Sequence, residues 1–214
     1  VNPAPDVDPY SVRAPTFGVG TVTTQSNGIY TDVFLDSPAS GSVPAGFIRI
    51  GARLDWGGSI VFFGLGADAN SNVIDANDTG RELQIALYDP ERIQQGCAYN
   101  ASCAVTPSTC PNSITYLGWD PVQGGDRCGH GGSVQSYGAH GDGVRLVVNP
   151  LQWNPDWERP DCQSSCGSSG VTANVTYTFD VRFVSTNVVE IATEVSSTET
   201  FSHNPTGQEF PTLY

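Results

Sequence analysis

A carboxylate that could transfer a proton, Glu82, stands two residues from the amide of Gln84. The surrounding stretch has strand character, and side chains two residues apart share one face of a strand. A carboxylate beside an amide on one face suits acid–base work or the recognition of hydroxyl groups. The alternatives are a polar, solvated strand face, or an Arg81 that pairs with a nearby Asp and holds a loop.

A second group of chemically capable side chains lies in the loop-like run from 119 to 130. Its members are an aromatic ring, two carboxylates, an amide, a guanidinium and an imidazole: Trp119, Asp120, Gln123, Asp126, Arg127 and His130. Sugar sites combine a flat apolar surface with fixed polar groups of this kind. The alternative is a loop whose tryptophan fills the core and whose aspartates form turns.

Trp153 and Trp157 stand four residues apart in a Pro-containing stretch. Two rings at this spacing form either a stacking surface for a ligand or anchors that fix the loop to the rest of the molecule.

Oxygen ligands for calcium recur between Asp68 and Asp78. Asp68, Asn70 and Asn72 alternate with other residues, and Asp75 and Asp78 follow. The run lacks the glycine and the terminal glutamate of an EF-hand loop, and such clusters also form plain turns. The Cys-x2-Cys pairs of structural zinc sites are missing. We therefore expect no resident metal and no cofactor, with calcium as the alternative.

The charge of the chain excludes several classes of partner. Among 214 residues there are 22 acidic and 9 basic side chains, all of the latter Arg, for a formal net charge of −13. This charge repels phosphate backbones, so we expect no nucleic-acid partner. No apolar run reaches the ~18 to 20 residues that cross a bilayer, so we expect no membrane insertion. The sequence begins with Val and holds no Met, which favours a processed chain or part of a longer product.

The cysteines predict an oxidising compartment. All six fall within one third of the chain, at Cys97, Cys103, Cys110, Cys128, Cys162 and Cys166. An even count favours disulfides, and short loops favour the pairs Cys97–Cys103, Cys110–Cys128 and Cys162–Cys166. Glycosylation motifs begin at Asn77, Asn100 and Asn174. Together these features predict a secreted, extracellular protein.

The elements that must position these side chains are strands. Residues 171–183 alternate apolar and polar side chains without an error, a turn follows at 185–187, and 188–195 returns as the second strand of a hairpin. Further strands are predicted at 47–50, at 82–88 and at 143–148, and the apolar run 59–65 is expected to be buried on both faces. The chain is therefore predicted to be all-β, an antiparallel β-sandwich without helices.

The domain organisation follows from composition. Residues 1–16 hold four prolines and predict an extended N-terminal segment. Residues 17–214 predict a single β-sandwich domain. Its segment at about 97–170 holds all six cysteines and is rich in Gly and Trp, so we expect a loop-rich insertion stapled by disulfides.

Two stretches resemble the galactose-mutarotase-like β-supersandwich. The first runs Asp55-Trp56-Gly57-Gly58-Ser59-Ile60, then Asn72-Val73-Ile74-Asp75, then Asp78-Thr79-Gly80-Arg81-Glu82-Leu83-Gln84. The second is the hairpin from Val175 to Val195 followed by His203-Asn204-Pro205 and Gly207-Gln208-Glu209-Phe210-Pro211. Where aldose epimerases carry a His before an aromatic residue, this chain has Gln208-Glu209-Phe210. The resemblance implies the fold and carbohydrate binding, and places Gln208 and Glu209 near the cleft.

These observations predict a secreted carbohydrate-binding β-sandwich, with the alternative of membership in a glycan-active hydrolase or lyase. The predicted catalytic carboxylates are Glu82, Asp120 and Glu209. The predicted substrate-binding residues are Arg81, Gln84, Trp119, Gln123, Asp126, Arg127, His130, Trp153 and Gln208. The competing hypothesis is an extracellular structural or filament-forming protein without catalysis, which associates with itself through strand edges.

Overall fold

The protein is described here by a computed structural model that covers residues 18–80, 82–89, 118–154, 169–205 and 207–213. Within these ranges the chain forms three antiparallel sheets and two short 3-10 helices, and none of these residues lies in an α-helix. The predicted all-β, antiparallel class is confirmed.

Each sheet has four strands. The first sheet runs β1 (Thr21–Ser26), β2 (Thr31–Asp36), β3 (Ile48–Arg53) and β4 (Ser59–Leu65). The second runs β11 (Val188–Ser197), β10 (Val175–Ser185), β8 (Gly143–Asn149) and β7 (Ser133–His140). The third runs β12 (Glu209–Thr212), β5 (Gln84–Ala86), β6 (Pro121–Val122) and β9 (Leu151–Gln152). The 3-10 helices are η1 (Leu54–Trp56) and η2 (Ala69–Ser71).

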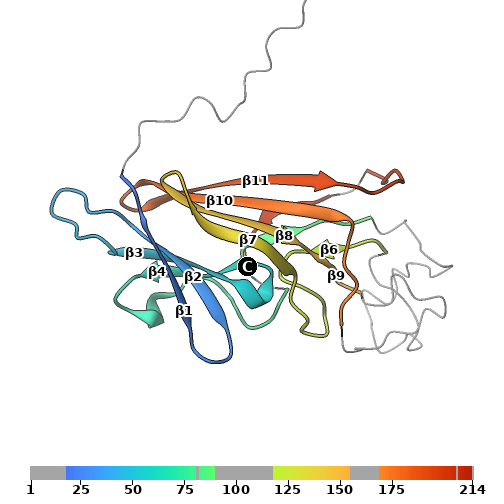
Figure 1. The fold of residues 1–214 in the computed structure, drawn as a ribbon, viewed down its shortest axis with the longest axis horizontal. Coiled ribbons are helices and arrows are strands. Elements are labelled where there is room, and N and C mark those ends of the chain that lie inside the picture. Colours follow the sequence, from blue (N-terminus) through green and yellow to red (C-terminus); the bar gives the residue numbers. More distant parts are fainter. Residues whose placement is uncertain (1–17, 81, 90–117, 155–168, 206, 214) are drawn as a thin grey trace, which may run out of the picture.

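The second sheet packs face to face against the other two, which gives the layers of a β-sandwich (Figure 1). One hydrophobic core joins all three sheets, with Leu35 from the first, Phe179 from the second and Ile85 from the third, each fully buried. A hydrogen bond also crosses the layers, because the Tyr177 hydroxyl donates to the Pro121 carbonyl at 2.9 Å.

The hairpin of β10 and β11 confirms the alternation read from the sequence. The odd-numbered side chains from Val175 to Phe183 are buried, and the even-numbered ones from Thr176 to Arg182 are partly exposed. Strand β11 pairs antiparallel along the whole length of β10, from Val175 opposite Ser197 to Ser185 opposite Val188. Apolar residues at every second position therefore fix the register of this pair.

Two predictions about strands are wrong. The run 59–65 is buried only over Ser59–Val61, because none of the described residues forms a second layer over the outer face of β4, where the partly exposed Phe62 meets Phe34 edge-on. Residues 133–140, assigned to a loop-rich segment, form strand β7. Its side chains are mostly small and polar, so pairing with β8, rather than an apolar pattern of its own, makes it a strand.

Candidate functional site

A pocket of about 190 Å³ opens on the third sheet, on the face opposite the hydrophobic core. Its lining consists of Gly80, Gln84, Ala86, Tyr88, Val122, Trp153 and Glu209. The volume lies below the ~300–1,000 Å³ of sites for drug-sized ligands, so the pocket suits one small ring.

Strand pairing assembles the pocket. Ala86 stands opposite Glu209 of β12 on one side and opposite Val122 of β6 on the other. These three positions form one row across the sheet, in which the small side chains of Ala86 and Val122 make an apolar floor. Gln84 and Tyr88 share the face of Ala86 because they lie two residues away along the chain. The floor is therefore apolar and the surrounding groups are polar or aromatic.

Tyr88 and Glu209 form one wall. The Tyr88 hydroxyl donates to Glu209 Oε2 at 3.0 Å. Gln208 fastens the same wall, since its side chain accepts from the Tyr88 N–H at 2.7 Å and donates to the Tyr88 carbonyl at 2.9 Å. Gln208 thus positions the wall and is exposed outside the pocket lining. Tyr88 was missed in the sequence analysis, although it continues the alternation of Gln84 and Ala86.

Gln84 and Glu82 both point toward Gly124. The Gly124 N–H donates to Gln84 Oε1 at 2.7 Å. A Cβ at Gly124 would lie 2.8 Å from that oxygen and 3.0 Å from Glu82 Oε2, so only glycine fits between the two side chains. Glu82 is fully buried and does not line the pocket, whereas Gln84 does. The shared face predicted for this pair exists, but it is covered rather than solvated.

Opposite this wall stands Trp153, whose ring packs over Gly80. A Cβ at Gly80 would lie 2.7 Å from the outer edge of the indole. The Trp153 backbone is fixed as well, because its N–H donates to the Asp120 carbonyl and its carbonyl accepts from the Arg127 N–H. The half-buried ring is thus held in place with one side toward the pocket.

The predicted residues of the 119–130 run hold the fold together. Asp120 is fully buried and its Oδ2 accepts from Asn154 at 2.9 Å. Gln123 is fully buried between the Ile85 N–H and the Gly57 carbonyl. These contacts match the interpretation in which polar side chains of this run secure turns and neighbouring strands.

The buried carboxylate of Asp126 holds a turn that ends at His130. Asp126 Oδ1 accepts from the N–H groups of Cys128 and His130, and Oδ2 lies 2.7 Å from His130 Nδ1. Arg127, between them, is partly buried and lies outside the pocket lining. Arg81 lies outside the described residues. Of the predicted site residues, the structure therefore brings Gln84, Trp153 and Glu209 together around one cavity.

Trp119 is a core residue, with 4% of its surface exposed. Its indole N–H donates to Glu199, and its ring lies 3.9 Å from that of His203. A ring covered in this way has no open face for a ligand. From the sequence, either a stacking role or a core role is open to this tryptophan, and the structure places it in the core.

Asp89 anchors the C-terminal segment beside Trp119. Its buried carboxylate accepts from Asn204 N at 3.0 Å, from Asn204 Nδ2 at 3.2 Å and from His203 Nδ1 at 3.1 Å. Burial raises the pKa of the Asp89 carboxyl, but the hydrogen bonds from Asn204 and His203 outweigh it and leave the pKa below its ordinary value of 3.8. This clamp lies just upstream of β12, which carries Glu209.

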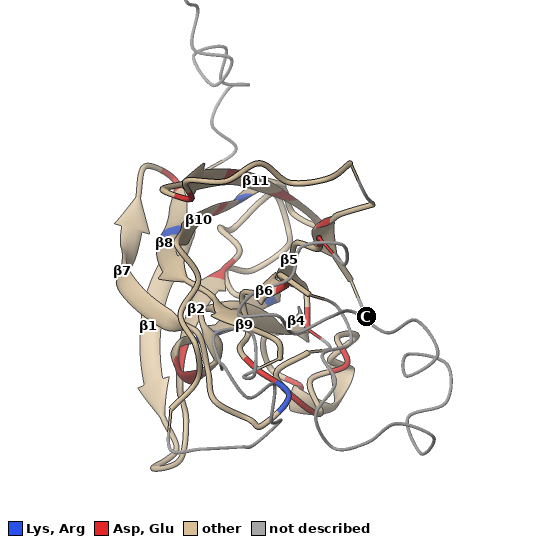
Figure 2. Ribbon diagram, turned by 90° about the vertical axis from the view of Figure 1, so that its right-hand side faces the viewer, with Lys and Arg blue, Asp and Glu red and all other residues tan. Residues whose placement is uncertain are grey.

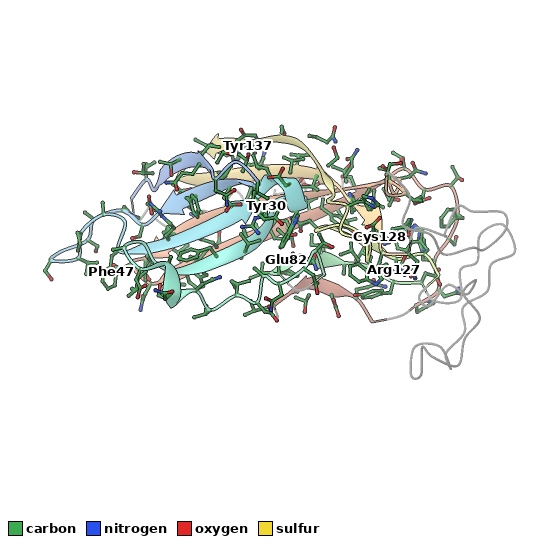
Figure 3. All side chains as sticks on the ribbon, turned by 90° about the horizontal axis from the view of Figure 1, so that it is seen from below. Tyr30, Phe47, Glu82, Arg127, Cys128 and Tyr137 are labelled. Atoms are coloured by element: carbon green, nitrogen blue, oxygen red, sulfur yellow. The ribbon has the colours of Figure 1, made fainter. Side chains whose placement is uncertain are left out.

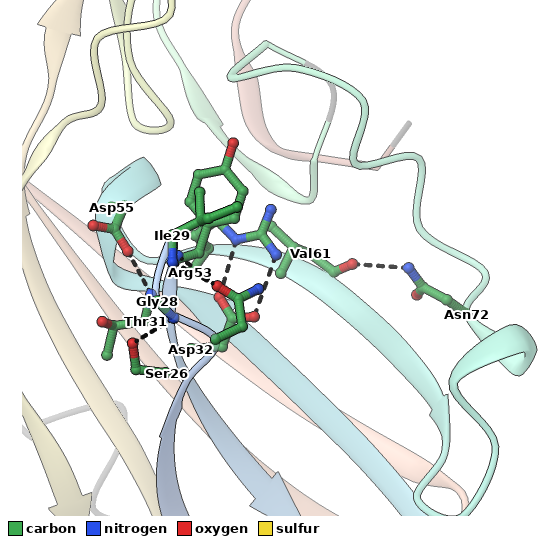
Figure 4. Close-up of polar contacts among 11 residues, drawn as sticks. Ser26, Gly28, Ile29, Thr31, Asp32, Arg53, Asp55, Val61 and Asn72 are labelled. Atoms are coloured by element: carbon green, nitrogen blue, oxygen red, sulfur yellow. Dashed lines mark hydrogen bonds and ion pairs between the residues drawn. The ribbon is translucent and has the colours of Figure 1, made fainter.

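The oxygen-rich run at 68–78 serves local turns. Asp68 caps η2 by accepting from the Asn70 N–H. The Asn72 side chain accepts from the Phe63 N–H and donates to the Val61 carbonyl, the latter contact drawn in Figure 4. Within the part of the chain that the structure describes, no group of three or more His, Cys, Asp or Glu side chains is placed to hold a metal ion.

Only some of the predicted disulfide and glycosylation residues lie within the described ranges. Cys128 is disulfide-bonded, and the other five cysteines lie outside the described residues, so the predicted pairing stays a prediction. Arg127 and Cys128 lie side by side near the edge of the molecule in Figure 3. Asn77 and Asn174 have exposed side chains, while Asn100 and Trp157 lie outside the described residues.

No protein-family model, no curated protein and no solved structure matches this chain. The described residues include no helix long and apolar enough to cross a membrane.

Proposed function

We propose that the chain is a secreted carbohydrate-binding protein whose pocket holds a single sugar ring between Trp153 and Glu209. The observation that carries this proposal is the lining of one small cavity by an indole, an amide, a phenol and a carboxylate. The resemblance to the β-supersandwich points to the same ligand class. In this proposal, disulfides hold the loops of the 97–170 segment.

The pocket offers a sugar its two kinds of contact. The apolar C–H face of a pyranose stacks on an indole, and Trp153 is the lining residue with such a ring. Gln84 Oε1 is occupied by Gly124 N–H, which orients the amide so that its NH2 group donates to a hydroxyl. A carboxylate accepts several hydrogen bonds, so Glu209 can accept from a hydroxyl in addition to Tyr88.

Binding explains the carboxylates better than hydrolysis does. Glycoside hydrolases need two carboxyl groups facing one substrate, ~5–10 Å apart. Of the three predicted catalytic carboxylates, Glu209 lines the pocket, whereas Glu82 and Asp120 are fully buried outside its lining. The proposed activity is therefore recognition of a glycan without cleavage.

A glycan array followed by calorimetry on the best ligand tests the proposal. Trp153→Ala is expected to weaken binding at least about tenfold, or ~1.4 kcal/mol, because it removes the stacking surface. Phe47→Ala removes an aromatic ring of 45% exposure from the bend just before β3 and serves as the matched control, expected to bind like the parent chain. Failure of the parent chain to retain any glycan, or full affinity in Trp153→Ala, would refute the proposal. Release of reducing ends from the ligand would instead establish an enzyme.

A further inference from the structure

The sandwich has two margins of different character. At one margin lie the edge strands β7 of the second sheet and β1 of the first, and neither β1 nor the stretch 133–139 of β7 contains a charged residue. Figure 2 shows both strands along the same side of the molecule in tan. The Gly20 N–H just before β1 donates to the Asp142 carbonyl just after β7, which fastens the two strands at this margin.

The remaining edge strands are covered, charged or interrupted by proline. On β4, Ile60 pairs with Leu83, and the N–H groups of Phe63 and Leu65 donate to the side chains of Asn72 and Ser71. On β9, Leu151 pairs with Thr172. Strand β11 presents the exposed carboxylates of Glu190 and Glu194, and β12 contains Glu209 and Pro211. Charges and proline are the usual means by which proteins protect a free strand edge. In a chain of net charge −13, the seven residues 133–139 of β7 therefore form an edge that differs from the covered, charged and proline-containing ones.

Large apolar side chains are also exposed at this margin. Tyr137 stands opposite the buried Leu146, so its side chain belongs to the inward row of β7, yet it is 47% exposed. Figure 3 places Tyr137 at the periphery of the molecule. Val19, next to the Gly20–Asp142 contact, is 69% exposed. Apolar surface thus lies beside an edge that has no strand partner among the described residues.

We propose that β7 pairs with β7 of a second copy of this chain, antiparallel about a twofold axis, so that two second sheets join into one of eight strands. A second copy fits because this margin lets two strongly acidic molecules approach without bringing carboxylates on the strands together. Self-pairing of one strand is isologous, so it closes as a dimer rather than growing into a fibre. Tyr137 is then covered by the partner. This inference does not depend on sugar binding.

Sedimentation velocity over a range of concentrations tests the pairing, with Ser136→Lys as the disrupting variant. Ser136 is exposed in the middle of β7, and a lysine on each copy places like charges across the axis. We expect a dimer for the parent chain and a dimer dissociation constant at least about tenfold higher for Ser136→Lys. Ser196→Lys on β11 is the matched control, since Ser196 is also exposed and the overall charge of both variants is the same.

The sign of the charge makes the test selective. Adding one lysine lowers the net negative charge, so general repulsion between copies falls in both variants. If Ser136→Lys dissociates the dimer and Ser196→Lys does not, the difference therefore reports a local contact at β7. A parent chain that stays monomeric up to its solubility limit overturns the proposal, as does a dimer that Ser196→Lys disrupts and Ser136→Lys does not.

Hydrogen exchange on the parent chain tests the β7 pairing without any variant, so this test does not depend on whether a variant folds. Amides of β7 are expected to be more protected in concentrated than in dilute solution, while those of β11 stay unchanged. Equal exchange of β7 at both concentrations would overturn the proposal even if Ser136→Lys failed to fold.

Discussion

Replacing Asp89 by alanine is expected to release the segment that carries one wall of the pocket. The Asp89 carboxylate accepts hydrogen bonds from His203 and Asn204, five or more residues before Glu209. Strand β12 is short and pairs with β5 at Glu209 and Thr212. Because the strand itself has few pairing contacts, we expect the Asp89 clamp to contribute much of what holds Glu209 in place.

The magnitude follows from the three contacts. Hydrogen bonds to a charged acceptor contribute ~1.5–3 kcal/mol each, so the three together would contribute about 4.5–9 kcal/mol if nothing replaced them. Water satisfies the freed donors once the exposed His203 and Asn204 detach, so we expect a smaller net loss of about 2–3 kcal/mol. A loss of this size raises the open population of the segment about 30- to 150-fold.

Native-state hydrogen exchange at neutral pH measures this opening directly. In Asp89→Ala the amide of Asn204 and those of β12 are expected to lose protection by that factor, while the amides of β10 keep most of theirs. Asp55→Ala is the control, because Asp55 is an exposed aspartate whose carboxylate accepts from the Thr31 N–H at the start of β2. Unchanged protection of Asn204 and β12 in Asp89→Ala would refute the reasoning.

Two further predictions concern stability. Because hydrogen bonds hold the folded-state pKa of Asp89 below its ordinary value of 3.8, its contribution is complete above the unfolded pKa and is lost as the pH falls through the folded one. Urea unfolding should therefore show a constant difference between the parent chain and Asp89→Ala down to about pH 4 and a shrinking one below it, and a difference that grows on acidification would contradict this. Tyr177→Phe removes the hydroxyl that donates to the Pro121 carbonyl across the layers, but that carbonyl still accepts from the Leu87 N–H. Urea unfolding at neutral pH is expected to show a loss of about 1 kcal/mol, and a loss above about 3 kcal/mol would mean that the bond has a larger role in joining the layers.

The strands that could be predicted are those whose partners lie next to them in sequence and whose inward face is covered. The hairpin of β10 and β11 meets both conditions, and its alternation was unbroken. Strand β2 was not predicted because the outward-facing Phe34 interrupts its alternation of apolar and polar residues. The Phe34 ring packs on Phe62 over Gly51, where a Cβ would lie 2.6 Å from that ring. The outward aspartates of β2 pair with Arg49 and Arg53 of β3, contacts that become evident only once the register is known.

At the site, contacts between residues far apart in sequence determine which side chains line the pocket. Alternation along a single strand does not predict these contacts. Alternation correctly places Gln84 and Ala86 on one face and extends to Tyr88, but it gives no sign that Gly124, 40 residues after Gln84, covers Glu82. Trp119 and Trp153 look alike in sequence, yet Glu199, 80 residues after Trp119, bonds to its indole beside the covering His203. The same folding leaves Trp153 at the pocket and Glu209 as the single predicted catalytic carboxylate in its lining. Because hydrolysis requires a second such group at this cavity, retention of an intact glycan is the activity to measure first.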